Sequence, residues 1–183
     1  FPENGRRVDQ EVVFQNPNHW TKVQAIQHFL QEAKQVLKPI GSFVSADVFG
    51  LTTTVNDDMG IGQKWEPIAA EVDYISPMVY PSHYSDGMYG IPHPDLNPYA
   101  IVKQAMMDAN RKQAQFKKTS MPNQNNQNEA TIIRPWFQDF TAAWIHPHKR
   151  YGYEEVMAQI NAAKEQKVDQ YLLWNPHCEY SLR

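Results

Sequence analysis

The fold follows from one stretch of the sequence, VDYISPMVYPSHY, which spans residues 72–84. Its first half is an apolar run, and a strand that is apolar on both faces is typical of a buried parallel strand. Its second half carries hydrogen-bonding and stacking side chains, which are Tyr80, Ser82, His83 and Tyr84. Polar and aromatic groups that follow a buried strand indicate a binding site of an α/β protein.

Apolar segments alternate with amphipathic ones along the rest of the chain. The pattern predicts four strands, at residues 42–50, 72–79, 131–137 and 169–174. It predicts helices at residues 18–38, at 65–71, from 97 onward and at 153–165. The apolar face of the first helix is expected to comprise Trp20, Val23, Ile26, Phe29, Ala33 and Val36. Strands separated by helices are parallel with right-handed crossovers, so all four carboxyl ends should lie on one side.

Composition narrows the class of protein. The 183 residues fit one domain with a real core. A net charge of −3 without a basic stripe argues against nucleic-acid binding. Cys178 is the single cysteine, so there is no disulfide framework or thiolate metal cage, and we expect no metal and no cofactor. No apolar run approaches the ~20 residues that span a membrane, and we expect no signal peptide in the chain.

The predicted strand ends carry the candidate site. In chain order these ends present Asp47, Tyr80 with His83, Trp136 with Asp139, and Trp174 with Asn175. Such convergence is typical of the active face of a (β/α)8 barrel, which usually needs ~250 residues, so the chain supplies about half of the units. Aromatic residues make up 12% of the chain, and those outside the core suit a cleft in which sugar rings stack on aromatic faces.

A family resemblance supports this interpretation. The sequence contains, in order, VSADVFG (44–50), DDMGIGQ (57–63), YISPMVYPSHY (74–84), IRPWFQDF (133–140) and LLWN (172–175). Together these motifs resemble the bacterial family of putative glycosyl hydrolase domains, over essentially the whole chain from Phe1. The resemblance implies a TIM barrel distantly similar to the α-amylase type, and residues 1–183 would form a single partial domain, its C-terminal half. In that family a strand bearing Asp and Arg precedes the segment FPENG, so the N-terminal half and the nucleophile that it would carry are expected to be absent.

The resemblance suggests catalytic roles for two carboxylates, since glycosidases generally use an acid together with a nucleophile or base. We expect Asp47 and Asp139 to be the catalytic candidates, as acid or stabiliser. Asp47 lies at a mostly apolar strand end, which suits a general acid. Two alternatives stay open: Asp47 caps a loop or pairs with Arg134, and Asp139 caps a helix in the segment TAAW.

The expected substrate-binding residues share aromatic or hydrogen-bonding side chains at the strand ends. They are Tyr80, His83, Tyr84, Trp136, Trp174 and Asn175. The alternatives are that His83 only closes its loop and that both tryptophans belong to the barrel core. Elsewhere, the Asp57–Asp58 region favours a turn over a Ca²⁺ site, and His146 with His148 favours a surface loop over a metal site. Residues 117–129 predict an exposed loop without a catalytic role.

The sequence therefore predicts part of a glycoside hydrolase that acts on a bacterial or environmental polysaccharide, with the chain alone inactive. The alternative is a carbohydrate-binding or cell-envelope scaffold domain without catalysis. A metal-dependent hydrolase on the same barrel would need a histidine cluster, and only His83 and His177 come near. We expect an extracellular or cell-envelope location. We also expect self-association, because half a barrel leaves strand edges unpaired and such edges can pair with a second copy of the chain.

Overall fold

The computed structural model describes residues 15–120 and 131–182. Residues 1–10, whose sequence FPENGRRVDQ predicts a loop, lie outside these ranges, as do residues 121–129 of the loop expected at 117–129. Within them, parallel strands and helices alternate, as the sequence pattern predicts. No helix in the described residues has the length and apolar character needed to cross a membrane.

The described strands form one parallel sheet. Their bounds are β1 Ser45–Phe49, β2 Tyr74–Val79, β3 Ile132–Ile133, β4 Trp136–Gln138 and β5 Leu172–Trp174. The order across the sheet is β1-β2-β4-β5, with β3 also paired to β2, and every pairing is parallel. The strand expected at 131–137 is split in two around Arg134 and Pro135. Proline has no N–H to donate to a ladder, which explains the break.

Four longer helices and several short ones connect the strands. The longer ones are α2 Lys22–Leu37, α3 Trp65–Ala69, α4 Pro98–Ser120 and α5 Tyr153–Glu165. The short 3₁₀ helices are η1 Lys38–Ile40, η2 Gly50–Thr53, η3 Pro81–His83, η4 Met88–Gly90 and η5 Pro94–Leu96. The bounds of α5 agree with the prediction, whereas α4 continues through residues 117–120, where a loop was expected.

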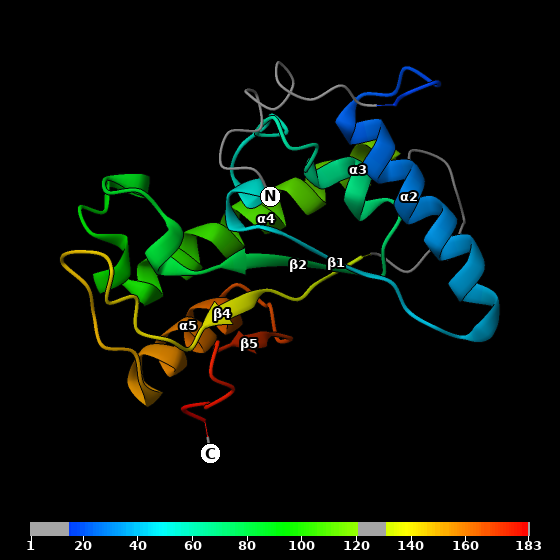
Figure 1. The fold of residues 1–183 in the computed structure, drawn as a ribbon. Helices are drawn as coiled ribbons and strands as arrows, with labels where there is room; N and C mark the ends of the chain where they lie inside the picture. Colours follow the sequence, from blue (N-terminus) through cyan, green and yellow to red (C-terminus); the bar gives the residue numbers. More distant parts are fainter. Residues whose placement is uncertain (1–14, 121–130, 183) are drawn as a thin grey trace.

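The hydrophobic core lies between the sheet and helices α3, α4 and α5, which pack on one of its faces (Figure 1). Fully buried members from these elements include Ile75, Val79, Phe137, Ile101, Met106, Val156 and Ile160. Because side chains alternate along a strand, the neighbours of Ile75 and Val79 point to the opposite face. That opposite face carries the candidate site.

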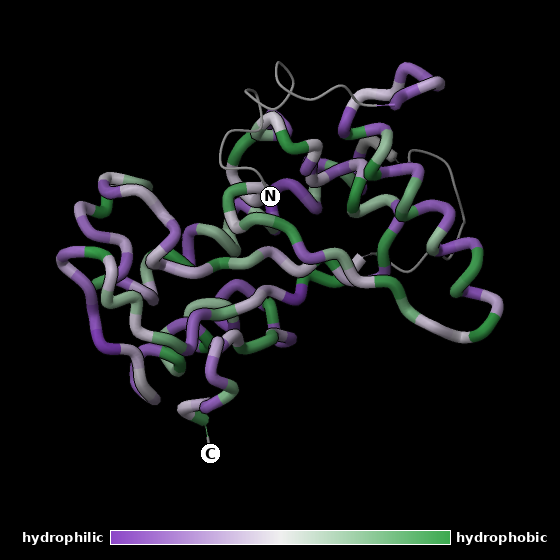
Figure 2. Tube along the Cα trace, viewed as in Figure 1, coloured by the Kyte–Doolittle hydropathy of each residue, from purple (hydrophilic) through white to green (hydrophobic). Residues whose placement is uncertain are grey.

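Helix α2 differs from the prediction in its start and its buried side. A capping box between Thr21 and Gln24 begins the helix, rather than a cap at Asn18. Leu30 is buried, but Phe29 and Val36 are 69% and 70% exposed. The helix packs mainly on α3 and leaves its other side open, with hydrophobic and hydrophilic residues alternating along it (Figures 1 and 2). The self-association expected from open edges stays a prediction.

Gly50 marks the place where the end of β1 approaches its neighbours most closely. A Cβ atom at this position would lie 2.5 Å from the carbonyl oxygen of Met78 and 2.7 Å from the hydroxyl of Tyr84. Both contacts are far shorter than a Cβ can make, so only glycine fits without a shift of β2 or of the loop after it.

We expect Gly50→Ala to lower the free energy of unfolding by about 1–3 kcal/mol, because the added methyl overpacks the junction. The matched control is Gly152→Ala, where the nearest atom, Oε2 of Glu155, is 4.0 Å from the position that the added methyl would take. That change should cost less than about 1 kcal/mol. Equal losses for the two variants in urea unfolding would show that the close approach at Gly50 does not exist.

Candidate functional site

The open face of the sheet brings several predicted residues together. Along β1 and β2 the register pairs Asp47 with Ser76. Ser76 is buried, and because side chains alternate along β2 it points away from the core residues Ile75 and Val79. On the other side of β2, Met78 pairs with Trp136 of β4. Paired residues of parallel strands share a face, so Asp47 and Trp136 point to the same side of the sheet from different strands.

Asp47 was expected at a strand end, but it is the middle residue of β1, because the strand extends to Phe49. Its carboxylate is exposed on the open face, and its neighbours are aromatic. The indole Nε1 of Trp136 donates a hydrogen bond of 2.9 Å to Oδ1 of Asp47. Burial, and then the nearby charge of Asp47, raise the pKa of the Tyr80 hydroxyl well above its usual value of 10.0. Tyr80 therefore keeps its proton at neutral pH and is available as a donor beside the carboxylate.

Arg134, the alternative partner of Asp47, makes a different contact. Its guanidinium lies over the ring of Tyr74, 4.0 Å from the ring centroid. Its Nε is buried without a hydrogen-bond partner. A cation held against an aromatic face is a stable arrangement, and it places the charge at the beginning of β2 rather than at the strand ends.

The two tryptophans of the predicted binding set lie edge to face. Trp136 and Trp174 have ring centroids 6.2 Å apart and an interplanar angle of 86°. Trp174 is 46% exposed, so a large part of the residue is accessible to solvent in this structure. A complete barrel would cover this face, so the binding and the barrel-core interpretations of the two tryptophans both stay predictions.

A second group of rings lies where β2 and β4 end. Tyr80 contacts His83 and Phe140 edge to face, with centroid distances of 5.3 and 5.8 Å. Nδ1 of His83 lies 3.1 Å from the hydroxyl of Ser82. The His83 side chain is exposed at one edge, yet desolvation by the atoms packed around it lowers the pKa of the imidazole below its usual 6.5. His83 is therefore neutral near pH 7 and can donate or accept a hydrogen bond.

Asp139 lies near this region but is buried, with only 2% of its surface exposed. Its carboxylate accepts hydrogen bonds from the amide and the hydroxyl of Ser181, at 2.8 and 2.6 Å. The side chain of Asn175 donates to the carbonyl oxygens of Asp139 and Glu179. These contacts hold the C-terminal segment against the end of β4. Segment 141–144 forms no helix, so Asp139 is not the helix cap that was the alternative.

Tyr84 belongs to the layer behind the site. It is only 6% exposed, and burial, with Tyr89 and Asp108 nearby, raises the pKa of its hydroxyl well above the usual 10.0. Tyr84 therefore supports the loops rather than facing solvent. Its exposed fraction is close to the 8% of Tyr80, and the expectation that Tyr84 contacts substrate stays a prediction.

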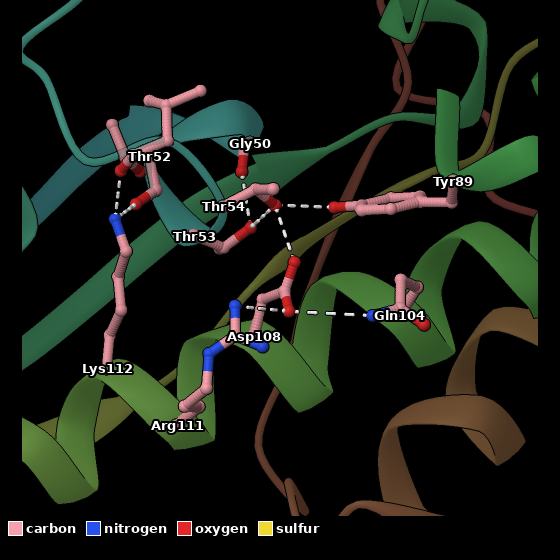
Figure 3. A network of polar contacts seen from close by, with 10 residues as sticks. Gly50, Thr52, Thr53, Thr54, Tyr89, Gln104, Asp108, Arg111 and Lys112 are labelled. Carbon is pink, nitrogen blue, oxygen red and sulfur yellow. Dashed lines mark hydrogen bonds and ion pairs between the residues drawn. The ribbon is translucent and has the colours of Figure 1, made fainter. Parts of the chain in front are cut away.

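A polar network beside Tyr84 joins the loops after β1 and β2 to α4 (Figure 3). The hydroxyls of Thr54 and Tyr89 lie 2.6 Å apart, and Thr54 also donates to Asp108 at 2.9 Å. Asp108 in turn pairs with Arg111 at 2.8 Å. Lys112 of the same helix donates to the carbonyl oxygens of residues 52 and 55. The network fixes the loop after β1, which begins shortly beyond Asp47.

Gln138 is the residue that the sequence reasoning missed. It is fully buried at the end of β4. Its Oε1 accepts from the amide of Ser82 at 3.0 Å, and its Nε2 donates to Oδ1 of Asp95 at 3.2 Å and to the carbonyl of Phe140 at 3.0 Å. One side chain thus joins the loop after β2, the loop after β4 and the segment before α4, which lie side by side in Figure 1. The available signal was an amide at the end of an apolar strand.

The part of the chain that the structure describes contains no group of side chains that could form a metal site. No three histidine, cysteine, aspartate or glutamate side chains lie close enough to hold a metal ion there. The rings of His146 and His148 are 5.5 Å apart, and Nδ1 of His148 lies 3.0 Å from the carbonyl oxygen of Ile145. These histidines lie in an exposed loop, as the sequence favoured.

Comparison with known proteins gives a family and a fold. Residues 1–180 match the family described as "Putative glycosyl hydrolase domain". The glycoside hydrolase domain of PgaB (BpsB) from Bordetella bronchiseptica is similar in structure, with a TM-score of 0.53 and 13% identity over 84% of this chain. The spore cortex-lytic enzyme SleL from Bacillus megaterium has a TM-score of 0.51 and 12% identity over 87%.

The chain spans less than half of these solved structures, covering 37% of the PgaB domain and 44% of SleL. At such low identity the likeness shows the fold alone. A search among curated proteins found no match.

We expect Gln138→Leu to lower the free energy of unfolding by about 2–4 kcal/mol, because it removes three hydrogen bonds and leaves Asp95 and the Ser82 amide without this partner. Gln35→Leu, at an exposed position of α2, is the control and should change it by less than about 0.5 kcal/mol. Denaturant unfolding measures both. Similar stabilities for the two variants would mean that the loops do not depend on the Gln138 amide.

We expect the imidazole of His83 to titrate below pH 6.5 in an NMR titration, because its neighbours desolvate the cation. Since the unfolded chain then binds a proton more readily than the folded one, the stability contributed by neutral His83 is present above pH 6.5 and falls as the pH drops below it. His83→Gln should remove this part of the pH dependence. A midpoint at or above 6.5 would contradict the desolvated environment.

Proposed function

Because the chain belongs to the family of putative glycosyl hydrolase domains, we propose that it forms part of the catalytic domain of a glycoside hydrolase that acts on a polysaccharide. The observation that carries the proposal is the placement of Asp47, an exposed carboxylate in the middle of β1 with Trp136 bonded to it and Tyr80 beside it. Carboxylates flanked by aromatic rings suit the cleavage of a glycosidic bond.

The sheet itself is proposed to be part of a (β/α)8 barrel. In support, the strands are parallel and follow the chain order across the sheet, and the described helices cover one face only. The uncovered face would then line the barrel interior, and the strand ends would form part of its active face.

In this proposal Asp47 is the general acid. The indole of Trp136 fixes Oδ1, which leaves Oδ2 as the atom assigned to the glycosidic oxygen. Transfer of a proton from Oδ2 to that oxygen would accompany cleavage of the bond to the anomeric carbon. A second carboxylate would complete the reaction, at ~5 Å for retention or ~6.5–9.5 Å for inversion. The burial of Asp139 and its bonds to Ser181 favour placing that second group outside β1 to β5.

Substrate binding is assigned to the rings that reach the surface. Trp174 offers an exposed face, and His83 offers a neutral imidazole beside Tyr80. Trp136 would orient Asp47 and border the same sugar. Asn175 is assigned a supporting role, because its side chain holds the turn after β5.

The similar structures are a glycoside hydrolase domain and a spore cortex-lytic enzyme. This likeness supports a bacterial polysaccharide as the substrate class and a location at the cell envelope or outside the cell. A second candidate is a domain that binds carbohydrate without cleaving it. The observation that favours it is the burial of Asp139, since Asp47 is then the one predicted catalytic carboxylate on the open face.

We expect Asp47→Asn to lower kcat of the full-length protein by about 10²–10⁴-fold, because the amide cannot deliver a proton. Trp136→Phe keeps the ring but removes the donor, and should cost roughly 10–100-fold, the equivalent of a hydrogen bond to a charged group. Release of reducing sugar from bacterial polysaccharides measures both effects.

The control is Asp169→Asn, an exposed carboxylate that precedes β5 and so lies at the opposite end of the sheet. It should leave kcat unchanged. If Asp47→Asn is as active as this control, Asp47 is not the acid. If the unmodified full-length protein binds polysaccharide but releases no sugar, the binding candidate holds instead.

A further inference from the structure

The aromatic rings of the site continue past Tyr80 into the loop that follows β4. Phe140 contacts both Tyr80 and His83, the latter at a centroid distance of 6.3 Å. On its other side Phe140 lies nearly parallel to Trp144, with centroids 6.1 Å apart and an interplanar angle of 16°. Neither Phe140 nor Trp144 belongs to the residues assigned to the site above.

Trp136 and Trp174 add two further rings to this series of contacts, because Trp136 bonds to Asp47 and packs edge to face on Trp174. Asp47 joins the two halves, because Trp136 bonds to it and its charge acts on Tyr80. The rings therefore run from Trp174, past the carboxylate, to the loop after β4.

Exposure along this line is highest at its ends. Trp174 is 46% exposed and Trp144 is 68% exposed, whereas Tyr80 in the middle is 8% exposed. Both outer indoles are exposed, and each contacts an inner ring, Trp174 contacting Trp136 and Trp144 contacting Phe140. Single exposed aromatic residues are common on protein surfaces, so the exposure of Trp144 alone would carry no meaning. What makes Trp144 significant is that its ring belongs to a connected series of rings that reaches the proposed site.

The loop that bears Trp144 is braced by hydrogen bonds. Gln138 donates to the carbonyl of Phe140 at 3.0 Å, and the amide of Tyr151 donates to the hydroxyl of Thr141 at 3.0 Å. The amide of Ile145 closes a turn onto the carbonyl of residue 142 at 3.2 Å. An aromatic side chain on a braced loop loses little freedom on binding, which favours a binding platform.

We propose that the loop of residues 139–145 forms an additional glycan subsite with Trp144 as its platform, so that the site binds a chain of several sugars extending from Trp174 past Asp47 to Trp144. The C–H faces of the sugar rings would stack on the outer indoles, while His83 and Tyr80 would bond to hydroxyl groups between them. The inference deepens the proposed function, on which it rests, by adding a subsite at Trp144 that binds a further part of the polysaccharide.

The test compares short and long ligands by isothermal titration calorimetry. Disaccharides and hexasaccharides of the chito- and cello-oligosaccharide series are titrated into full-length protein carrying Asp47→Asn, so that the ligand stays intact. We expect a hexasaccharide to bind more tightly than its disaccharide. Adding Trp144→Ala should weaken hexasaccharide binding about tenfold, with little effect on the disaccharide.

Phe29→Ala is the matched control, because Phe29 is exposed to the same extent, 69%, but lies on α2, away from the loops at the strand ends (Figure 1). Equal hexasaccharide affinity for the Trp144 and Phe29 variants, or no length-dependent binding in either series, would overturn the subsite. The proposed function would fail separately from the subsite. If hexasaccharide binding depends on Trp144 but Asp47→Asn does not lower turnover, the subsite holds and Asp47 is not the general acid.

Discussion

The amide of Gln138 is the contact on which the site depends. It is enclosed at the end of β4, where water does not compete for its hydrogen bonds, and three loop segments bond to it. Asp95, one of its partners, also accepts a hydrogen bond of 2.8 Å from the amide of Lys149, so the segment at Lys149 is held to the same group. The hydroxyl of Tyr151 adds a bond of 3.0 Å to the carbonyl of Asp95. The loops after β2 and β4 consequently share one arrangement.

The chemistry of the open face follows from that arrangement. Asp47 and Trp136 come from β1 and β4, on either side of β2. Their register with β2 places them on the same face, where the Trp136 indole bonds to Asp47. Tyr80, His83 and Phe140 come from segments that the buried amide positions. A carboxylate held by the rigid sheet is thus bordered by aromatic rings from hydrogen-bonded loops. This combination suits a glycan, whose sugar rings stack on aromatic faces and whose glycosidic bond is cleaved at the carboxylate.

The sequence predicts the architecture better than the site. The parallel α/β order and the helix at 153–165 could be predicted, because both depend on local periodicity. The burial of Asp139 could not, since it results from Ser181, which approaches from 42 positions further along the chain. Tyr84 is enclosed for a similar reason, as its hydroxyl lies against the close approach at Gly50. Strand-end position predicts that a side chain is near the site, whereas tertiary contacts decide whether it faces solvent.

The central claim is that a glycan chain lies across the strand ends. The chain has 5 tryptophans, and each indole N–H gives its own NMR signal. During titration with a chito-hexasaccharide, the signals of Trp136, Trp144 and Trp174 should shift. The signal of Trp65, which is fully buried and bonded to Gln113, and that of Trp20, which precedes α2, should stay in place. A shift confined to Trp20, or none at all at saturating glycan, would contradict the account.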